Sequence, residues 1–167
     1  VVSLLVAALA VAATVLVIQG AYFGLITALV LRSLFFSLVG SGGLLVLGLR
    51  APALWLRLLC YALAPAILLP GLYIQGSFAA IVQRGGMAQP QDLWIFAAMM
   101  AALLVLILRG VGWALLILAL AALAYAFWGY LIPGEYGHRG YSLRRLASML
   151  MLSTEGIFGL PMGVAVE

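Results

Sequence analysis

Long apolar runs separated by short polar or turn-forming stretches make up most of the chain. A membrane-spanning helix needs about 20 mainly apolar residues, and five runs approach or exceed that length. They cover residues 1–18, 27–47, 53–82, 93–108 and 111–130. Gly, Pro, Gln and Arg residues lie between them and mark helix ends or connecting loops. The pattern predicts an all-α integral membrane protein, a bundle of about five transmembrane helices.

Three positions inside these runs refine the prediction. Pro65 and Pro70 fall within the third run, which is too long for a straight span, so we expect a kink and a tilt there. Arg32 lies near the start of the second run. A charge at the centre of a membrane helix costs about 2.5–3.5 kcal/mol. We therefore expect the second helix to begin shortly before Arg32, so that the side chain reaches the interface.

Polar residues and turn formers gather in the last third of the chain. Ser142 is a good helix N-cap, and the positions after it divide into two faces with helical spacing. The apolar positions are Leu143, Leu146, Met149 and Leu150, and the polar ones are Arg144, Arg145 and Ser148. We therefore predict a C-terminal amphipathic helix that lies in the membrane interface.

A second helix start is expected directly after it. Ser153 or Thr154 caps this helix, and Glu155 occupies its first turn, where the helix dipole favours a carboxylate. The apolar stretch that follows is interrupted by Gly156, Gly159, Pro161 and Gly163. Such interruptions are typical of the discontinuous helices found near binding sites in secondary transporters.

Composition supports the membrane assignment. Hydrophobic residues make up 68% of the 167 residues and charged residues only 7%, whereas soluble domains carry about 25%. The net charge of +4 comes from arginines spread singly between apolar runs, which suits loop ends and lipid headgroups better than nucleic acid. The lone Cys60 is expected to be a buried, inert thiol. Because the first residue is Val and no basic leader precedes the first run, we expect the chain to be cut from a longer one.

Small residues indicate where helices pack closely. Two rows recur at four-residue spacing, which places their members on one helix face. They are Ser33, Ser37 and Ser41, joined by Gly40, and the pair Ala97 and Ala101. We interpret both rows as helix-packing surfaces, with a polar substrate path along the serines as the alternative.

Residues that carry chemistry are few. No nucleophile–base pair, metal-ligand cluster or phosphate loop stands out, so we predict no catalytic, metal or cofactor site and no enzyme. His138, beside Arg139 and Glu135, is either a proton-sensitive switch or a solvated loop histidine.

Three further charged residues have two interpretations each. Glu155 is either close to membrane depth and coupled to function, or a helix-start carboxylate at the interface. Arg144 and Arg145 contact lipid headgroups from the amphipathic helix or, alternatively, form a salt bridge with another subunit.

The same region carries a resemblance to a known family. It lies in HRGYSL (residues 138–143) and LSTEGIFGLP (152–161), with VGWAL (111–115) and YAFWG (125–129) upstream. These segments look like the junction region of fused TRAP transporter permeases, in which a small four-helix membrane subunit is joined to a large one. Within residues 1–108 the likeness consists mainly of shared hydrophobicity, with Arg84-Gly85 and Asp92.

The resemblance implies a division near Arg109. Residues 1–108 resemble the small permease subunit, and residues 109–167 comprise a fifth transmembrane helix, the amphipathic helix and the truncated start of a large-permease-like segment. Where the family has an acidic residue and paired arginines before residue 111, this chain keeps only Arg109. The family's ion and substrate sites lie beyond Glu167, so no ligand residue is carried over, and transport by this chain alone is not expected.

Two functional hypotheses follow. The resemblance implies a multi-pass component of the bacterial inner membrane that imports organic acids with an ion gradient, a large permease subunit and a periplasmic substrate-binding protein. The alternative is a transporter-derived accessory subunit that packs against a larger membrane complex. Both place the chain in a lipid bilayer beside other membrane subunits and away from nucleic acid.

Sidedness is predicted from the arginines. Alternation of the helices puts two sets at opposite ends: Arg50, Arg57 and Arg109 at one end, and Arg32, Arg84, Arg139, Arg144 and Arg145 at the other. The positive-inside rule favours a cytoplasmic location for the larger set.

Overall fold

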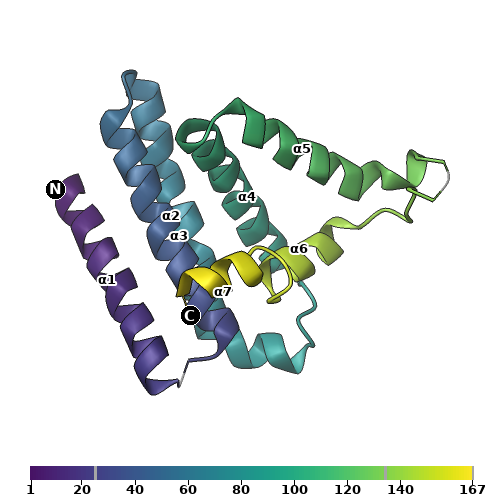
Figure 1. The fold of residues 1–167 in the computed structure, drawn as a ribbon, viewed down its shortest axis with the longest axis horizontal. Coiled ribbons are helices and arrows are strands. Elements are labelled where there is room, and N and C mark those ends of the chain that lie inside the picture. The colour runs from purple at the N-terminus through teal and green to yellow at the C-terminus, as the bar shows by residue number, and fades with distance from the viewer. Residues whose placement is uncertain (25, 134, 167) are drawn as a thin grey trace.

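The computed structural model describes residues 1–24, 26–133 and 135–166, and within them the chain is helical without strands. Figure 1 shows the ribbon, with helices α1 to α7 labelled and coloured in chain order. The elements are α1 (Val2–Phe23), α2 (Ala28–Arg50), α3 (Leu54–Gln83), α4 (Pro90–Gly110), α5 (Trp113–Trp128), the 3-10 helix η1 (Gly129–Leu131), α6 (Leu143–Met151) and α7 (Leu160–Val166).

Five of these helices are long and apolar enough to cross a membrane. They are α1 to α4 and the continuous stretch Trp113–Leu131, formed by α5 with η1. The predicted all-α bundle of about five transmembrane helices is therefore confirmed. The shorter α6 and α7 lie beyond the spanning region of the sequence.

Helix ends differ from the predicted ones by several residues. The first helix was expected to stop at Ile18, but α1 continues to Phe23 and ends at Gly24, whose φ of 60° is left-handed. Its N–H bonds to the Gly20 carbonyl at 3.1 Å. Gln19 and Gly20 are polar or flexible but compatible with a helix, and the termination comes from the left-handed glycine. Because α2 begins at Ala28, Arg32 lies in its second turn, close to the predicted place.

Helix α3 is longer than the bilayer core and is bent. The 30 residues of α3 span about 45 Å, more than the roughly 30 Å hydrocarbon core. Pro65 and Pro70 lie inside it, and Figure 1 shows its last turns running in a different direction from its first ones, as expected for a proline bend.

Helix α4 runs through Arg109 to Gly110, so the turn to α5 falls at Val111 and Gly112. The φ angle of Gly112 is 123°.

The core lies around α2. This helix packs against α1 on one side and α3 on the other and also touches α4 and α7. Leu44 of α2, Ile67 and Ile74 of α3 and Met99 of α4 are fully buried. By contrast, α1 and α5 each bury a single residue, Ala13 and Leu116. Their exposed apolar faces are those that a lipid bilayer covers, and Figure 1 shows α5 standing away from the bundle.

Candidate functional site

Polar contacts gather at one end of the bundle, which we call the loop face. It comprises the α1–α2 connection, the α3–α4 connection (residues 84–89) and the C-terminal segment from α6 to α7. Ala88 and Arg32 bond to this C-terminal segment, so the end of the chain lies against the ends of α2, α3 and α4.

A buried ion pair joins α3 to α4 at this face. Asp92, in the first turn of α4, is 0% exposed, and its Oδ2 lies 2.9 Å from Nη2 of Arg84. The Tyr73 hydroxyl donates to Oδ1 of Asp92. The backbone N–H of Gln89 donates to Oδ2 at 2.7 Å. The carboxylate also benefits from the positive end of the α4 dipole.

The environment of Arg84 favours its charged form. Burial lowers the pKa of Arg84, but the Tyr73 hydrogen bond and the charge of Asp92 outweigh it, so the pKa is raised above its already high ordinary value. Gln91 adds a bond from Nε2 to the Tyr73 hydroxyl at 3.3 Å. The Asp92 carboxylate is thus paired with a cation and with hydrogen-bond donors from the same chain. The cluster therefore connects α3 to α4 and stabilises their packing.

Sequence reasoning did not identify this cluster. Asp92 was named only in the family resemblance, Arg84 only there and among the arginines that predict sidedness, and Tyr73 was not predicted to have a role. A usable signal was present, because Asp92 is the only acidic residue before Glu135. A single carboxylate at the start of a membrane helix needs a nearby cation, and Arg84 is eight positions away.

The predicted amphipathic helix is present as α6. Ser142 caps it, accepting the N–H of Arg145 at 3.3 Å. The face that α6 buries agrees with the predicted one in part, because Leu146 is buried and Leu150 packs against the core. Leu146, Ala147 and Met151 are buried, whereas Leu143 and Met149 are 44% and 38% exposed. Leu146, Ala147 and Met151 are buried because α6 packs against α4 and the α3–α4 connection.

That contact is anchored by the side chain of Ser148. Its hydroxyl accepts the N–H of Ala88 at 2.8 Å, so a residue assigned to the solvent face points toward the protein. Arg144 and Arg145 remain exposed, and the Arg145 guanidinium lies 5.1 Å from the centre of the Tyr141 ring. Both arginines are therefore accessible to lipid headgroups or to a partner.

The helix predicted to start at Ser153 or Thr154 is not formed. Residues 152–159 are bends and turns, and α7 begins only at Leu160. The Ser153 hydroxyl does accept the N–H of Glu155, at 3.2 Å, but this closes a single turn. The backbone then folds onto α6, with the N–H of Ile157 bonded to the Leu150 carbonyl at 3.1 Å.

Gly156 makes this fold-back possible. A Cβ at that position would collide with the backbone of Met149 and Leu150, so no other residue fits without moving α6. Glu155 is exposed and lies at a hollow of about 440 Å³ that is also lined by Gly85, Gly86 and Ser148. It is a turn residue at the surface and not a first-turn helix carboxylate.

Arg32 and Phe158 hold the segment against α2. Nη1 of Arg32 reaches the carbonyl oxygens of Phe158 and Gly159 at 3.4 and 3.5 Å. The Phe158 ring is fully buried and meets Phe36 edge-on at 5.5 Å. A Cβ on Gly163 would lie 2.7 Å from Nη2 of Arg32. Sequence analysis placed Arg32 at the interface but did not foresee its contact with residues 126 positions away.

His138 stabilises the connection between η1 and α6. Its Nδ1 accepts the N–H of Gly140 at 2.9 Å, and Nε2 lies 3.0 Å from the Tyr125 carbonyl. Because Nδ1 accepts, Nε2 is the ring nitrogen placed to donate to the Tyr125 carbonyl, and the ring packs between Tyr125 and Tyr141. Arg139 and Glu135 are exposed. The histidine thus lies in a packed, hydrogen-bonded position, unlike a solvated loop histidine.

The two rows of small residues lie in different environments. Ser33, Ser37, Gly40 and Ser41 are all buried. Ser37 accepts the N–H of Gly71 of α3 at 3.0 Å, and a Cβ on Gly40 would lie 2.9 Å from Ile67. The serine row therefore lies where α2 and α3 approach closely. Ala97 and Ala101 are exposed on α4, and helix packing at this pair stays a prediction.

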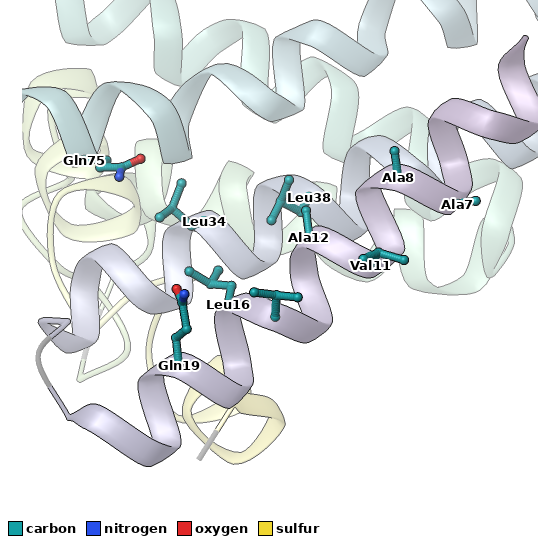
Figure 2. Close-up of a pocket in the computed structure, with 10 residues that line it drawn as sticks. Ala7, Ala8, Val11, Ala12, Leu16, Gln19, Leu34, Leu38 and Gln75 are labelled. Carbon is teal, nitrogen blue, oxygen red and sulfur yellow. The ribbon is translucent and has the colours of Figure 1, made fainter.

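An apolar groove lies between α1 and helices α2 and α3. Its volume is about 690 Å³. Figure 2 shows it with the amides of Gln19 and Gln75 at one end and the small residues of α1 toward the other. The lining residues are Ala7, Ala8, Val11, Ala12, Val15, Leu16, Gln19, Leu34, Leu38 and Gln75.

Comparison with known proteins adds no relative. No protein family matches the sequence, and no curated protein or solved structure shows a significant match. In the described part of the chain no group of three or more His, Cys, Asp or Glu side chains is placed to hold a metal ion. What this multi-pass membrane protein does must therefore be argued from its own residues and geometry.

Proposed function

We propose that this chain is a membrane component of a TRAP-type secondary transport system, and that it supports the transport of organic acids without carrying them alone. The observation that carries the proposal is the fold-back of the C-terminal segment onto the loop face. Residues 138–161, which hold the main resemblance to fused TRAP permeases, are the ones that form α6 and the turn before α7. They contact α2 through Arg32 and the α3–α4 connection through Ala88.

The interior of the bundle supports a scaffolding role over a translocating one. The buried polar side chains in the described residues are Ser33, Ser37, Ser41 and Asp92. An organic anion requires cationic or donor groups that are left over after folding. Asp92 is an anion already held by Arg84, and Ser37 already accepts a bond from Gly71. Substrate and coupling ions are therefore expected to bind in a partner.

The partners proposed with this function are a large permease subunit and a periplasmic substrate-binding protein, in a bacterial inner membrane. Contact with a lipid bilayer follows directly from the five spanning helices. The break in helical structure at residues 152–159 supports the assignment, because discontinuous segments of this kind border the sites of secondary transporters.

The experiment is an uptake assay in cells that express the chain with its native neighbours. Replacing Gly156 by Val forces the turn away from α6 and should abolish gradient-driven organic acid uptake, as well as co-purification of the large permease in mild detergent. The matched control is Gly76→Ala, where an added Cβ meets nothing within 4 Å. Intact uptake in Gly156→Val membranes containing normal amounts of the protein would contradict the proposal.

An accessory subunit of another membrane complex is the second candidate. It is favoured by the exposed apolar surface of α5, where Leu118 is 66% exposed. Mass spectrometry of the complex purified in mild detergent separates the two. A large permease polypeptide in the complex supports the transport system, whereas a stable complex without one supports the accessory role.

A further inference from the structure

The groove between α1 and the bundle is apolar along its length and polar at one end. Its wall is apolar along α1, and its two polar side chains, Gln19 and Gln75, lie at the same end (Figure 2). Both amides are exposed, and within the described residues neither has a hydrogen-bond partner. An amide that faces hydrocarbon without a partner is costly, so something in the membrane is expected to bond to it.

The two amides lie at one depth in the bilayer. Gln19 is four residues before the end of the 22-residue α1, and Gln75 is eight residues before the end of the 30-residue α3. With α1 centred on a core of about 30 Å, the rise of about 1.5 Å per residue places Gln19 roughly 5 Å inside the hydrocarbon boundary. Gln75, which follows the bend of α3, lies at the same end of the groove as Gln19 (Figure 2). Glutamine side chains reach the ester level of the lipids from there.

From the amides the groove runs along α1 to Ala7, about 18 Å for twelve residues. Half of the hydrocarbon core is about 15 Å, so the apolar wall is at least as long as one leaflet is thick. The small side chains of Ala7, Ala8 and Ala12 widen the groove, and Val11, Val15 and Leu16 complete its apolar wall. The polar end lies near the lipid esters, and the apolar wall continues from there past the bilayer midplane, which is long enough for an acyl chain of a lipid in the leaflet on the loop-face side.

We propose that this groove holds an ester-linked phospholipid, with the amide N–H groups of Gln19 and Gln75 donating to its ester carbonyls and an acyl chain lying along α1. A membrane helix from a partner is the competing occupant. A helix can offer a polar side chain at any depth, whereas lipid esters occur only near the boundary, where both amides are. The lipid then fills the space between α1 and α3 and stabilises the loosely packed α1.

The test compares an ester lipid with its ether analogue by native mass spectrometry of the full chain in mild detergent. The probes are a diacyl phosphatidylcholine and the dialkyl form of equal chain length, which lacks carbonyl acceptors. The wild-type chain should bind the ester form about threefold to tenfold more tightly. The Gln19→Leu/Gln75→Leu chain should bind both forms equally. Equal binding of both lipids by the wild-type chain would overturn the proposal, and this comparison does not depend on how the variants fold.

A second measurement places the acyl chain. Ala12→Trp should block the groove and reduce the binding of both lipids. Ala10→Trp should not, because Ala10 is exposed, lies outside the groove lining and is about 200° around the helix from Ala12. A benzophenone side chain at position 12 should capture lipid in native membranes. Capture of a transmembrane segment of a polypeptide there, or equal loss of lipid binding in both Trp variants, would contradict the proposal.

Discussion

At the scale of single residues, Asp92 shows how this bundle holds a charged side chain away from solvent. It is fully buried yet bonds to Arg84, Tyr73 and the Gln89 N–H. Removing one member of a buried pair leaves the other charge uncompensated, which is more damaging than removing both.

Asp92→Asn is therefore expected to destabilise the protein by about 3 kcal/mol, near the lower end for buried pairs because Arg84 retains some exposure. Tyr73→Phe should cost about 1.5–2 kcal/mol, the contribution of a hydrogen bond to a charged group. Thermal unfolding in detergent measures both. Trp94→Leu, at an 80% exposed position, is the control and should change little. Equal stability of Asp92→Asn and the control would show that the pair is dispensable.

The pH dependence of this pair follows from the raised pKa of Arg84. A base with a raised pKa contributes stability that is present below its unfolded pKa and is lost only when the pH rises through the folded value. Since the ordinary pKa of a guanidinium already lies far above neutral pH, Arg84 stays protonated there. Arg84 should therefore add no pH dependence to unfolding between about pH 6 and pH 9, and a stability transition in that window that disappears in Arg84→Gln would contradict this.

His138 and Gly129 form a second pair that depends on shape. The imidazole lies so close to Gly129 that an added Cβ would overlap the ring. Gly129→Ala should therefore displace His138 and cost about 1–3 kcal/mol. In a His138→Ala background the same glycine substitution should cost almost nothing. A double-mutant cycle measured by thermal unfolding detects this coupling, and additive effects would mean that the two residues act independently.

At the scale of elements, the sequence was informative about which segments are helical and much less so about how they meet. Apolar runs identified all five spanning helices because a bilayer imposes length and composition on them. The glycines at positions 20 and 24 are both compatible with a helix end, and the end of α1 was predicted five residues early, before Gly20 instead of at Gly24. The turn at residues 152–159 was missed because its cause is the long-range contact of Gly156 with α6, which local capping signals do not contain.

The close approach of α2 and α3 gives a prediction at this scale. A Cβ on Gly71 would lie 2.8 Å from the Ser37 hydroxyl and 2.9 Å from the Ser33 carbonyl. Because one of these atoms is backbone, Gly71→Ala must push the helices apart, and we expect a loss of about 1–3 kcal/mol. Gly76→Ala on the same helix has open space around it and serves as the control. Unfolding in mixed detergent micelles measures the difference, which should vanish if α2 and α3 are not in contact.

The fold-back of α7 depends on Arg32. Arg32→Met keeps much of the apolar stem but removes the donors to the Phe158 and Gly159 carbonyls. Hydrogen exchange of residues 157–163 should then accelerate by roughly tenfold, the equivalent of about 1.4 kcal/mol. Arg109→Met, at an exposed position, should leave that exchange unchanged. Unaltered exchange in Arg32→Met would mean that the buried Phe158 alone retains the segment.

At the scale of the whole molecule, the bundle is polarised between its two ends. The C-terminal segment joins the α3–α4 connection through Ala88 and Ser148 and joins α2 through Arg32. This geometry places Arg32, Arg84 and the arginines of α6 at one end. Arg50, Arg57 and the α4–α5 turn are at the opposite ends of the same helices. Since arginines concentrate in cytoplasmic loops, the loop face is expected to be cytoplasmic.

Cysteine labelling in intact cells tests this orientation. The native Cys60 is buried and is first replaced by Ala. Labelling then comes from the introduced cysteine. Met87→Cys lies in the α3–α4 connection, where the native side chain is 68% exposed, and it should react with a membrane-impermeant maleimide only after permeabilisation. Pro52→Cys, exposed between α2 and α3, should react in intact cells. The opposite pattern would put the arginine-rich face outside, and α6 would then meet the outer leaflet, on the side of a periplasmic binding protein. Labelling of both sites from one side would contradict the membrane-spanning arrangement of α3 itself.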